Sequence, residues 1–477
     1  MKGIQSQGVY ACPKHFAVNS QELRRMAMNA VLDERTLREI YLTGFEIAVK
    51  EGKAKAIMTS YNQVNGTYAN ENRHLLQDIL RKEWGFDGIV ITDWGGSNDH
   101  IEGIKARSDL EMPAPGLDSA RQILSALGNG SLTMEELDIC VDDLLHAVLT
   151  LSKNRKAKKS SFSQLAHHNL AREAAQKSTV LLKNKDNILP IPPGMKVALI
   201  GDFAVNPRYQ GAGSSMVKPT FLETMEKCIS NYDVQTAGIA KGYKRTGGDD
   251  KELEKEALDI AKKADIVLYC FGLDEISEVE GMDRSHMRIP QNQIKILQSI
   301  VQVNENIIGI LSGGAAVEMP WHTCCKAILH GYLSGQAGAS ALLDILTGTV
   351  NPSGRLAESC PVRYEDTPAY KYFPSIERNS EYRESIYIGY RYYDTCRIKV
   401  QYPFGYGLSY TEFTYSDITI EKQGIKVRIT NTGGRDGAEV VQMYVGLPNA
   451  VVFRPAKELK GFAKIFLKSG ESREVHI

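Results

Sequence analysis

The sequence lacks an excess of charge of either sign, a long apolar run, and cysteines with the spacing of a metal site. Its 477 residues include 57 Lys and Arg against 57 Asp and Glu, so the charge balance does not favour a nucleic acid or an anionic membrane surface as a partner. No apolar run approaches the roughly 20 residues needed to span a bilayer, and Met1-Lys2-Gly3 does not open a signal peptide. We therefore expect a protein with no nucleic-acid partner and no membrane partner.

The eight cysteines are scattered along the chain, and most lie in segments that we predict to be apolar strands or helices. This usage is typical of reduced, buried thiols and fits a reducing compartment, so we expect a cytoplasmic location. With 43% hydrophobic and 24% charged residues, the chain has the composition of a globular protein, and its length allows two or three domains.

Residues 1–152 alternate predicted strands and helices at about 30 to 40 residues per unit, which favours a parallel sheet with right-handed crossovers. The predicted strands cover residues 8–12, 54–59, 88–92 and 108–113, and the predicted helices cover residues 35–51, 72–84, 99–106, 117–127 and 134–152. A closed eight-stranded barrel needs about 250 residues, so we expect the C-terminal half of a TIM-type (β/α) barrel. Because half a barrel leaves two open edges, we expect that the chain is cut at its N-terminus or that another polypeptide supplies the rest.

Residues 153–164 are predicted to be a solvated linker, because this segment is rich in cations and hydroxyls and has no hydrophobic periodicity. From residue 165 to residue 365, a second pattern predicts an α/β sandwich domain with an open, mainly parallel sheet and helices on both faces. Its predicted strands cover residues 196–200, 264–270, 307–311 and 327–332, and its predicted helices cover residues 252–263, 291–303 and 336–346. The glycine fingerprint of a dinucleotide site is absent after the first of these strands, so we expect no dinucleotide there.

Residues 366–415 are rich in tyrosine and are predicted to connect domains. Beyond residue 416 the pattern becomes all-β, with runs at residues 425–430, 438–445 and 459–467 that are separated by Gly and Asn turns. The last segment is shorter than the roughly 100 residues of a seven-stranded sandwich. We therefore expect a partial β-sandwich that is cut at its C-terminus.

Asp93 follows the apolar run Ile89-Val90-Ile91, which is typical of a strand buried on both faces. The ends of parallel barrel strands point into the catalytic mouth, and Trp94-Gly95-Gly96 can bend around a ligand there. Taken alone, an Asp at this place is also explained as the N-cap of the next helix.

The predicted strand ends of the first block carry further side chains that suit a sugar. They are Lys14, His15, Arg25, Tyr61 and Trp94. Since strand ends converge on one mouth, we expect these groups to surround one cavity. Lys, His and Arg donate hydrogen bonds to hydroxyls and keep a nearby carboxylate ionised, while Trp offers a flat apolar face. An ionised Asp93 in this setting suits a glycosidic nucleophile.

Glycoside hydrolysis also needs a second, protonated carboxyl that gives a proton to the leaving oxygen. The first block has no equally clear candidate, but the loop over residues 271–284, directly after a predicted strand, holds five acids. They are Asp274, Glu275, Glu278, Glu280 and Asp283. Taken alone, such a loop is usually a solvated turn. Like charges this close would, however, raise the pKa of the least exposed acid, which is what a general acid requires.

The order and spacing of these motifs resemble the β-glucosidases of glycoside hydrolase family three over essentially the whole chain. In the first block the resemblance rests on Lys14-His15-Phe16, Asn19-Ser20-Gln21-Glu22, Arg25, Ser60-Tyr61-Asn62, Asn65-Gly66, Trp84-Gly85-Phe86, Thr92-Asp93-Trp94 and Asp109-Leu110-Glu111-Met112-Pro113. Further along the chain it rests on Glu280-Gly281-Met282-Asp283-Arg284, Pro352-Ser353-Gly354-Arg355-Leu356 and Pro403-Phe404-Gly405-Tyr406-Gly407-Leu408-Ser409-Tyr410.

This resemblance implies a three-domain retaining β-glycosidase with a barrel, an α/β sandwich and a fibronectin-type-III-like domain. It implies Asp93 as the nucleophile and Glu280 of the sandwich domain as the acid/base, with Glu278 and Glu275 in reserve. It further implies a β-glucoside or short β-linked oligosaccharide as substrate, with no metal and no organic cofactor. The substrate-binding residues that it implies are Lys14, His15, Arg25, Tyr61, Trp94 and Ser214.

The chain departs from the family pattern in two ways. The family's first barrel half, with an aspartate that holds the sugar's distal hydroxyls, has no counterpart, and the end of the third domain is missing. In addition, Ala17-Val18-Asn19 replaces the Gly-His-Gly pattern of the family's N-acetylglucosaminidases, which argues for β-glucosides. Three hypotheses stay open: a β-glucosidase, a sister specificity such as β-xylosidase or arabinofuranosidase, and a catalytically incomplete fragment or sugar-binding scaffold. A homodimer is also left open.

Overall fold

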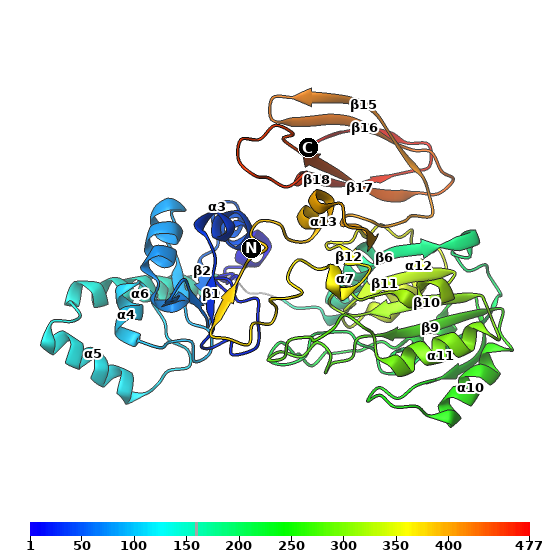
Figure 1. Ribbon diagram of the computed structural model, residues 1–477, viewed down its shortest axis with the longest axis horizontal. Coiled ribbons are helices and arrows are strands. Elements are labelled where there is room, and N and C mark those ends of the chain that lie inside the picture. Colours follow the sequence, from blue (N-terminus) through cyan, green and yellow to red (C-terminus); the bar gives the residue numbers. More distant parts are fainter. Residues whose placement is uncertain (158–160) are drawn as a thin grey trace. The chain divides into compact units, whose positions relative to one another are not determined.

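The structure describes residues 1–157 and 161–477 of the chain. In this computed structural model the chain divides into two compact units (Figure 1). The first unit contains Met1–Phe162, Gly281–Asp283 and Ala369–Ile386, and the second unit contains Ser163–Glu280, Arg284–Pro368 and Tyr387–Ile477. The end of the acidic loop and part of the tyrosine-rich segment thus belong to the first unit.

The first unit is built mainly from short strands and helices that alternate along the chain. Its strands are β1 (Asn29–Val31), β2 (Ala56–Met58), β3 (Gln63–Val64), β4 (Thr67–Tyr68), β5 (Ile89–Ile91) and β13 (Asn379–Glu381). Its helices are α1 (Lys2–Gln5), α2 (Glu34–Thr36), η1 (Leu37–Leu42), α3 (Thr43–Lys50), η2 (Ala69–Glu71), η3 (His74–Glu83), α4 (His100–Lys105), α5 (Leu117–Asn129) and α6 (Met134–Ala157). The five predicted helices of this block are confirmed, the first of them as the continuous run of α2, η1 and α3.

Four segments of the first unit lie side by side in parallel, as expected for half of a (β/α) barrel. β2 pairs with β5, and single parallel bridges place Phe16 beside Thr59 and Leu110 beside Ile91. The apolar face of η3 shares a core with Val90 of β5. This core fixes the strand from which Asp93 emerges.

The predicted strand over residues 8–12 is wrong. The main chain pairs with β2 a few residues later: the Met58 N–H donates to the Pro13 carbonyl (3.2 Å), and the Phe16 N–H donates to the Met58 carbonyl (2.9 Å). Proline has no N–H to donate, so a regular ladder does not continue through Pro13.

The predicted domain boundaries differ from the structure at two places. α6 extends to Ala157, into the predicted linker over residues 153–164, and residues 158–160 of that linker lie outside the described residues. Within the predicted connector over residues 366–415, β13 joins a four-stranded sheet in the order β13-β1-β3-β4 and pairs in parallel with β1. Buried Gln21 adds to this connection, because its side chain accepts from the N–H of Ser375 and donates to its carbonyl. The tyrosine-rich segment is therefore part of the first unit's fold as far as Ile386.

The second unit is centred on a six-stranded sheet in the order β6-β11-β10-β9-β7-β8. Neighbouring strands are parallel except for β6 and β11, so the predicted open, mainly parallel sheet is confirmed. Its strands are β6 (Val180–Asn184), β7 (Lys196–Ile200), β8 (Gln235–Ala240), β9 (Ile266–Gly272), β10 (Ile307–Ser312) and β11 (Ala327–Tyr332). The helices along this part of the chain are α7 (Gln164–Ser178), η4 (Lys185–Asn187), α8 (Asp202–Val205), α9 (Met225–Cys228), η5 (Ile229–Asn231), α10 (Lys251–Ala261), α11 (Gln291–Val301), η6 (Pro320–Cys324), α12 (Gly338–Leu346) and η7 (Tyr364–Asp366).

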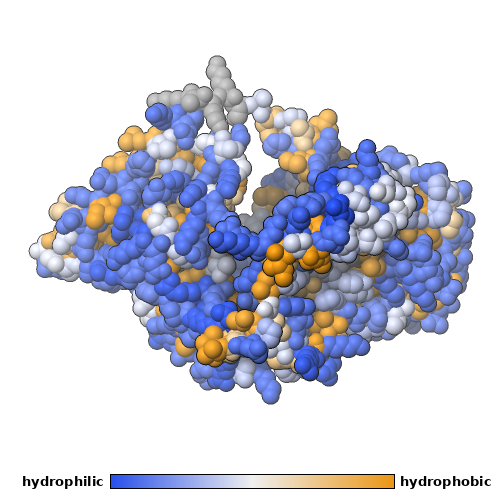
Figure 2. Space-filling model, turned by 90° about the horizontal axis from the view of Figure 1, so that it is seen from above, coloured by the Kyte–Doolittle hydropathy of each residue, from blue (hydrophilic) through white to orange (hydrophobic). Residues whose placement is uncertain are grey.

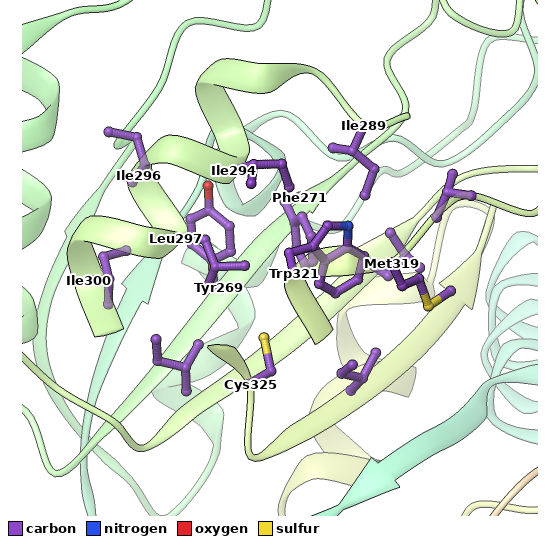
Figure 3. Packing of buried hydrophobic residues seen from close by; sticks show 14 of the residues in the cluster. Tyr269, Phe271, Ile289, Ile294, Ile296, Leu297, Ile300, Met319, Trp321 and Cys325 are labelled. Atoms are coloured by element: carbon purple, nitrogen blue, oxygen red, sulfur yellow. The ribbon is translucent and has the colours of Figure 1, made fainter. Parts of the chain in front are cut away.

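Successive side chains of a strand point to opposite faces of a sheet. Because the central strands are continuous apolar runs, apolar residues cover both faces of this sheet. One core includes Tyr269 and Phe271 of β9, and Figure 3 shows Phe271 beside Trp321, with ring centroids 4.7 Å apart. The opposite core includes Leu268 of β9 and Leu343 of α12. Every residue of β9 is consequently buried, and the acidic loop leaves from the end of a rigid strand.

The last part of the second unit is mostly β. β15 (Phe413–Glu421), β16 (Gly424–Asn431) and β19 (Ser472–His476) form one antiparallel sheet, and β17 (Gly437–Val445) pairs with β18 (Glu458–Leu467). The three predicted all-β runs are confirmed as β16, β17 and β18. Before them, β12 (Cys360–Pro361) pairs with β14 (Val400–Tyr402), and α13 (Tyr390–Cys396) precedes β14.

The face of the molecule in Figure 2 is largely hydrophilic, with hydrophobic residues in separate small groups. Across residues 1–157 and 161–477, no helix combines the length and apolar character needed to cross a membrane. All eight cysteines are free thiols, and five of them are buried.

Candidate active site

The strand before Asp93 is held in place by a buried ion pair. Arg81 Nη2 donates to Asp109 Oδ2 (2.8 Å), and neither side chain is more than 6% exposed. Asp109 Oδ2 also accepts from the Val90 N–H (2.7 Å), and Arg81 Nη1 donates to the Gly88 carbonyl (3.1 Å). Burial raises the pKa of Asp109 to about 6, although Arg81 opposes this shift. The pair therefore anchors β5 at its start and at its centre.

Asp93 lies just beyond β5, and both of its carboxylate oxygens have partners. Oδ1 accepts from the Trp94 N–H (2.7 Å), and His15 Nε2 lies 3.1 Å from Oδ2. The side chain of Asp93 is 12% exposed. The following helix α4 is capped by Asp99, whose side chain accepts from two N–H groups of the first turn. The alternative that Asp93 caps this helix is therefore wrong.

Tyr61 and Arg25 lie next to the loop that carries Asp93. The Tyr61 hydroxyl donates to the Trp94 carbonyl (3.1 Å), and the Arg25 guanidinium carbon lies 5.0 Å from the centre of the Tyr61 ring. Trp94 is 61% exposed, so its ring is accessible to a ligand. The predicted residues that the first unit brings together are His15, Arg25, Tyr61, Asp93 and Trp94, while the adjacent Lys14 is exposed.

Glu280 and Ser214 meet within the second unit. Glu280 Oε2 accepts from the Ser214 N–H (2.6 Å), and the Glu280 N–H donates to the Ala212 carbonyl (3.2 Å). Ala212 also forms a parallel bridge with Val279. The contact from Ser214 to the acid is thus made by its main chain.

Glu278 and Glu275 of the same loop have other partners than Glu280. Both oxygens of Glu278 accept from the Gly314 N–H (2.9 Å each), and Arg208 Nη2 lies 3.6 Å from Glu278 Oε2. Glu275 is 42% exposed and lies 3.7 Å from Arg245. Because several of its carboxylates accept main-chain hydrogen bonds, the loop is more than a solvated turn.

The sequence predicts no role for three further residues: Asp283 in the first unit, and Arg208 and Glu358 in the second. The Asp283 carboxylate accepts from the main chain of the first unit. Glu358 accepts from the Ala316 N–H (3.0 Å), and burial, with a smaller contribution from Glu278, raises its pKa. The sequence marks Asp283 only as part of Glu-Gly-x-Asp-Arg, and it carries no local signal for the other two.

Within the described ranges, no three side chains of His, Cys, Asp or Glu are grouped so that they could hold a metal ion. What the first unit offers instead is a carboxylate at the end of a barrel strand, with hydrogen-bond donors and an exposed indole around it. Each unit presents one hydrogen-bonded carboxylate, Asp93 in the first and Glu280 in the second, and a pair of carboxyl groups is what the class of glycoside hydrolases requires.

Comparison with known families agrees with this class. The family descriptions "Glycosyl hydrolase family 3 N terminal domain", "Glycosyl hydrolase family 3 C-terminal domain" and "Fibronectin type III-like domain" match residues 1–147, 179–410 and 439–477, respectively. The chain belongs to glycosyl hydrolase family 3. The resemblance seen in the sequence and the three-part architecture that it implies are thus confirmed.

Three relatives illustrate the similarity. The thermostable beta-glucosidase B of Acetivibrio thermocellus is 44% identical over 486 residues, which cover 100% of this chain and 64% of the relative. The exo-alpha-(1->6)-L-arabinopyranosidase of Bifidobacterium breve is 41% identical, with coverage of 100% and 65%. The crystal structure of a Bifidobacterium adolescentis beta-glucosidase superposes with a TM-score of 0.95 at 41% identity, with coverage of 100% and 71%. The chain therefore spans about two thirds of the length of these relatives.

Proposed function

We propose that the protein is a retaining β-glucosidase that hydrolyses terminal, non-reducing β-D-glucosyl residues. The observation that carries this proposal is the setting of Asp93, a strand-end carboxylate with the Trp94 N–H on one oxygen and His15 beside the other. Family membership supports the reaction class. Two of the three relatives described above are named beta-glucosidases, which supports glucosides or short β-linked oligosaccharides as substrates.

In the first half of the proposed reaction, Asp93 attacks the anomeric carbon while Glu280 gives its proton to the leaving oxygen. In the second half, Glu280 takes a proton from water, and the water displaces Asp93 from the same carbon. Two inversions retain the configuration.

The sugar would be held by side chains of the first unit. His15 lies beside the nucleophile and is placed to donate to a sugar hydroxyl, and the exposed Trp94 ring offers an apolar face. Arg25 and Tyr61 form the neighbouring wall, and Lys14 adds a further donor.

A second candidate is an α-L-arabinopyranosidase, because the Bifidobacterium breve relative carries that activity in its name at 41% identity. An α-L-arabinopyranoside has the ring configuration of a β-D-galactoside without the C6 hydroxymethyl group. The β-xylosidase and arabinofuranosidase alternatives are not favoured by these relatives.

The substrate class is tested with 4-nitrophenyl β-D-glucopyranoside, β-D-xylopyranoside and α-L-arabinopyranoside. We expect the highest kcat/KM on the glucoside. A higher value on the arabinopyranoside would favour the second candidate. Binding of glucose without hydrolysis of any of the three would favour a sugar-binding scaffold.

The roles of the two acids are tested on the same glucoside. Asp93→Asn should lower kcat/KM by at least about 10³-fold, and azide added to Asp93→Gly should restore turnover with an α-glucosyl azide as product. Glu280→Ala should lower kcat/KM less on glucosides with good leaving groups than on those with poor ones, because good leaving groups barely need a proton. Equal losses on good and poor leaving groups would move the acid/base role to Glu278 or Glu275. Asp118→Asn, at an 80% exposed side chain on α5, is the control.

A further inference from the structure

The tripeptide Gly281–Asp283 belongs to the first unit, although the chain on both sides of it belongs to the second. It follows Glu280 directly, so its position limits where the backbone of Glu280 can lie. Consecutive Cα atoms are about 3.8 Å apart, and only two residues separate Glu280 from Asp283.

Asp283 fixes this tripeptide through three close contacts with the main chain. Its Oδ1 and Oδ2 lie 2.9 and 3.1 Å from the Glu22 nitrogen, and its Oδ2 accepts from the Leu23 N–H at 2.7 Å. Hydrogen bonds from backbone N–H groups to an ionised carboxylate are charge-assisted and stronger than neutral ones. We call this arrangement the Asp283 clasp.

The Glu22 side chain extends the clasp toward the predicted sugar-binding residues. Glu22 Oε2 accepts from the Gly281 N–H (3.2 Å) and from Arg25 Nη1 (3.1 Å). Arg25 in turn lies over the ring of Tyr61. The same carboxylate oxygen thus serves the residue after Glu280 and a candidate sugar-binding arginine.

From Tyr61 the contacts continue to the nucleophile. The Tyr61 hydroxyl donates to the Trp94 carbonyl, and the Trp94 N–H donates to Asp93 Oδ1. An unbroken series of contacts inside the first unit therefore connects Asp283 to Asp93.

We propose that Asp283 is a positioning residue that holds the backbone next to Glu280 at a fixed place relative to the sugar-binding residues, so that the acid/base is aligned for proton transfer. This proposal rests on the proposed β-glucosidase function and on Glu280 as its acid/base. Asp283 takes no part in bond making. Its effect is on the geometry of Glu280, and a misplacement of about 1 Å is enough to cost about 10²-fold in rate.

The test compares kcat/KM on two β-glucosides that differ in their need for a general acid. For Asp283→Ala we expect a loss of about 10²-fold on methyl β-D-glucoside and of less than about 5-fold on 2,4-dinitrophenyl β-D-glucoside, which needs little protonation. Asp283→Asn keeps one acceptor oxygen and should lie between the wild type and Asp283→Ala. Asp118→Ala, the control with a highly exposed side chain, should change neither value.

A second measurement does not depend on activity. Hydrogen exchange of the Glu22 and Leu23 amides should become faster in Asp283→Ala, because both lose their acceptor. Unchanged exchange at these amides would show that the clasp is not formed. Equal losses on both glucosides in both Asp283 variants would show a merely structural role.

The two proposals fail in different ways. If the wild-type protein hydrolyses β-glucosides and the Asp283 variants lose kcat/KM equally on the two substrates, only the positioning role is wrong. If the wild-type protein hydrolyses neither substrate, the proposed function is wrong and the positioning role falls with it.

Discussion

At the scale of single residues, Gly213 packs directly against Glu280. Its backbone has φ +101°, and a Cβ built there would lie 2.5 Å from the Glu280 Cβ and 2.8 Å from its Oε2. With a Cβ at this distance the Glu280 side chain would have to shift, and a positive φ is itself unfavourable for an L-residue with a Cβ. Glycine here lets the Ser214 N–H reach the Glu280 carboxylate.

We therefore predict that Gly213→Ala displaces Glu280. The kcat/KM on methyl β-D-glucoside should fall by about 10²-fold. The value on 2,4-dinitrophenyl β-D-glucoside should fall much less, because 2,4-dinitrophenolate leaves without being protonated. Gly194→Ala is a matched control, since Gly194 has φ +75° and no atom within 4 Å of a built Cβ. Both variants should lose about 1 to 2 kcal/mol of stability from the positive φ, but only Gly213→Ala should lose activity. Equal activity of the two variants would contradict the prediction.

The two acids that the sequence predicts as catalytic, Asp93 and Glu280, both come after an apolar run. Asp93 comes directly after such a run, and the acidic loop with Glu280 follows the fully buried β9. Asp283 contacts Glu22 across 261 positions of the chain, and no local pattern records a pairing over that distance. The choice among the loop acids likewise depends on contacts such as that between Glu278 and Gly314, which only the folded chain shows.

At the scale of elements, the same contrast separates strands that have an unbroken apolar run from strands that have none. β9 and β10 are predicted because several apolar residues in succession give a clear signal. β1 and β13 have three residues each, which is too few for a period to be visible, and they pair across 350 residues of sequence. The buried side chain of Gln21, which holds Ser375, supports that pairing with polar contacts that no hydrophobic pattern contains.

β11 carries a histidine in the interior of the six-stranded sheet, between β6 and β10. His330 is 3% exposed, and its Nδ1 lies 3.2 Å from the Leu311 carbonyl. Burial lowers its pKa from 6.5 to about 4, because the charged ring would lose its hydration. The strand therefore holds this ring neutral at pH values at which the unfolded chain already binds a proton.

This shift predicts how the stability of the second unit depends on pH. The contribution of neutral His330 is fully present above about pH 6.5 and is lost progressively as the pH falls to about 4, with a total of about 3 kcal/mol. His330→Asn, which retains a donor for the Leu311 carbonyl, should reduce the loss of unfolding free energy between these pH values by about that amount. His286→Asn, at an exposed histidine, should leave it unchanged. Urea unfolding of the three proteins at several pH values measures the difference, and identical pH dependence in all three would contradict it.

At the scale of the whole molecule, the two compact units are made from six chain segments, three in each. Five passages of the chain therefore connect the units, among them the peptide bond between Glu280 and Gly281. Each unit nevertheless buries hydrophobic cores of its own: Leu76 lies in a core of the first unit and Ile308 in a core of the second. Separate cores allow separate cooperative transitions, since a chain of this size need not unfold in two states.

We predict that thermal unfolding shows two transitions that single core substitutions move independently. Leu76 and Ile308 are both 0% exposed, and truncation of such side chains costs about 2 to 5 kcal/mol. Leu76→Ala should lower the transition of the first unit by about 5 to 15 °C and leave the other in place, while Ile308→Ala should do the reverse. Calorimetry records the transitions, and hydrogen exchange of peptides from β5 and β10 assigns each to its unit. A single common transition that both variants shift would contradict this prediction. The five connections would then make the two units unfold together, and a substitution in either core would also affect the backbone on both sides of Glu280.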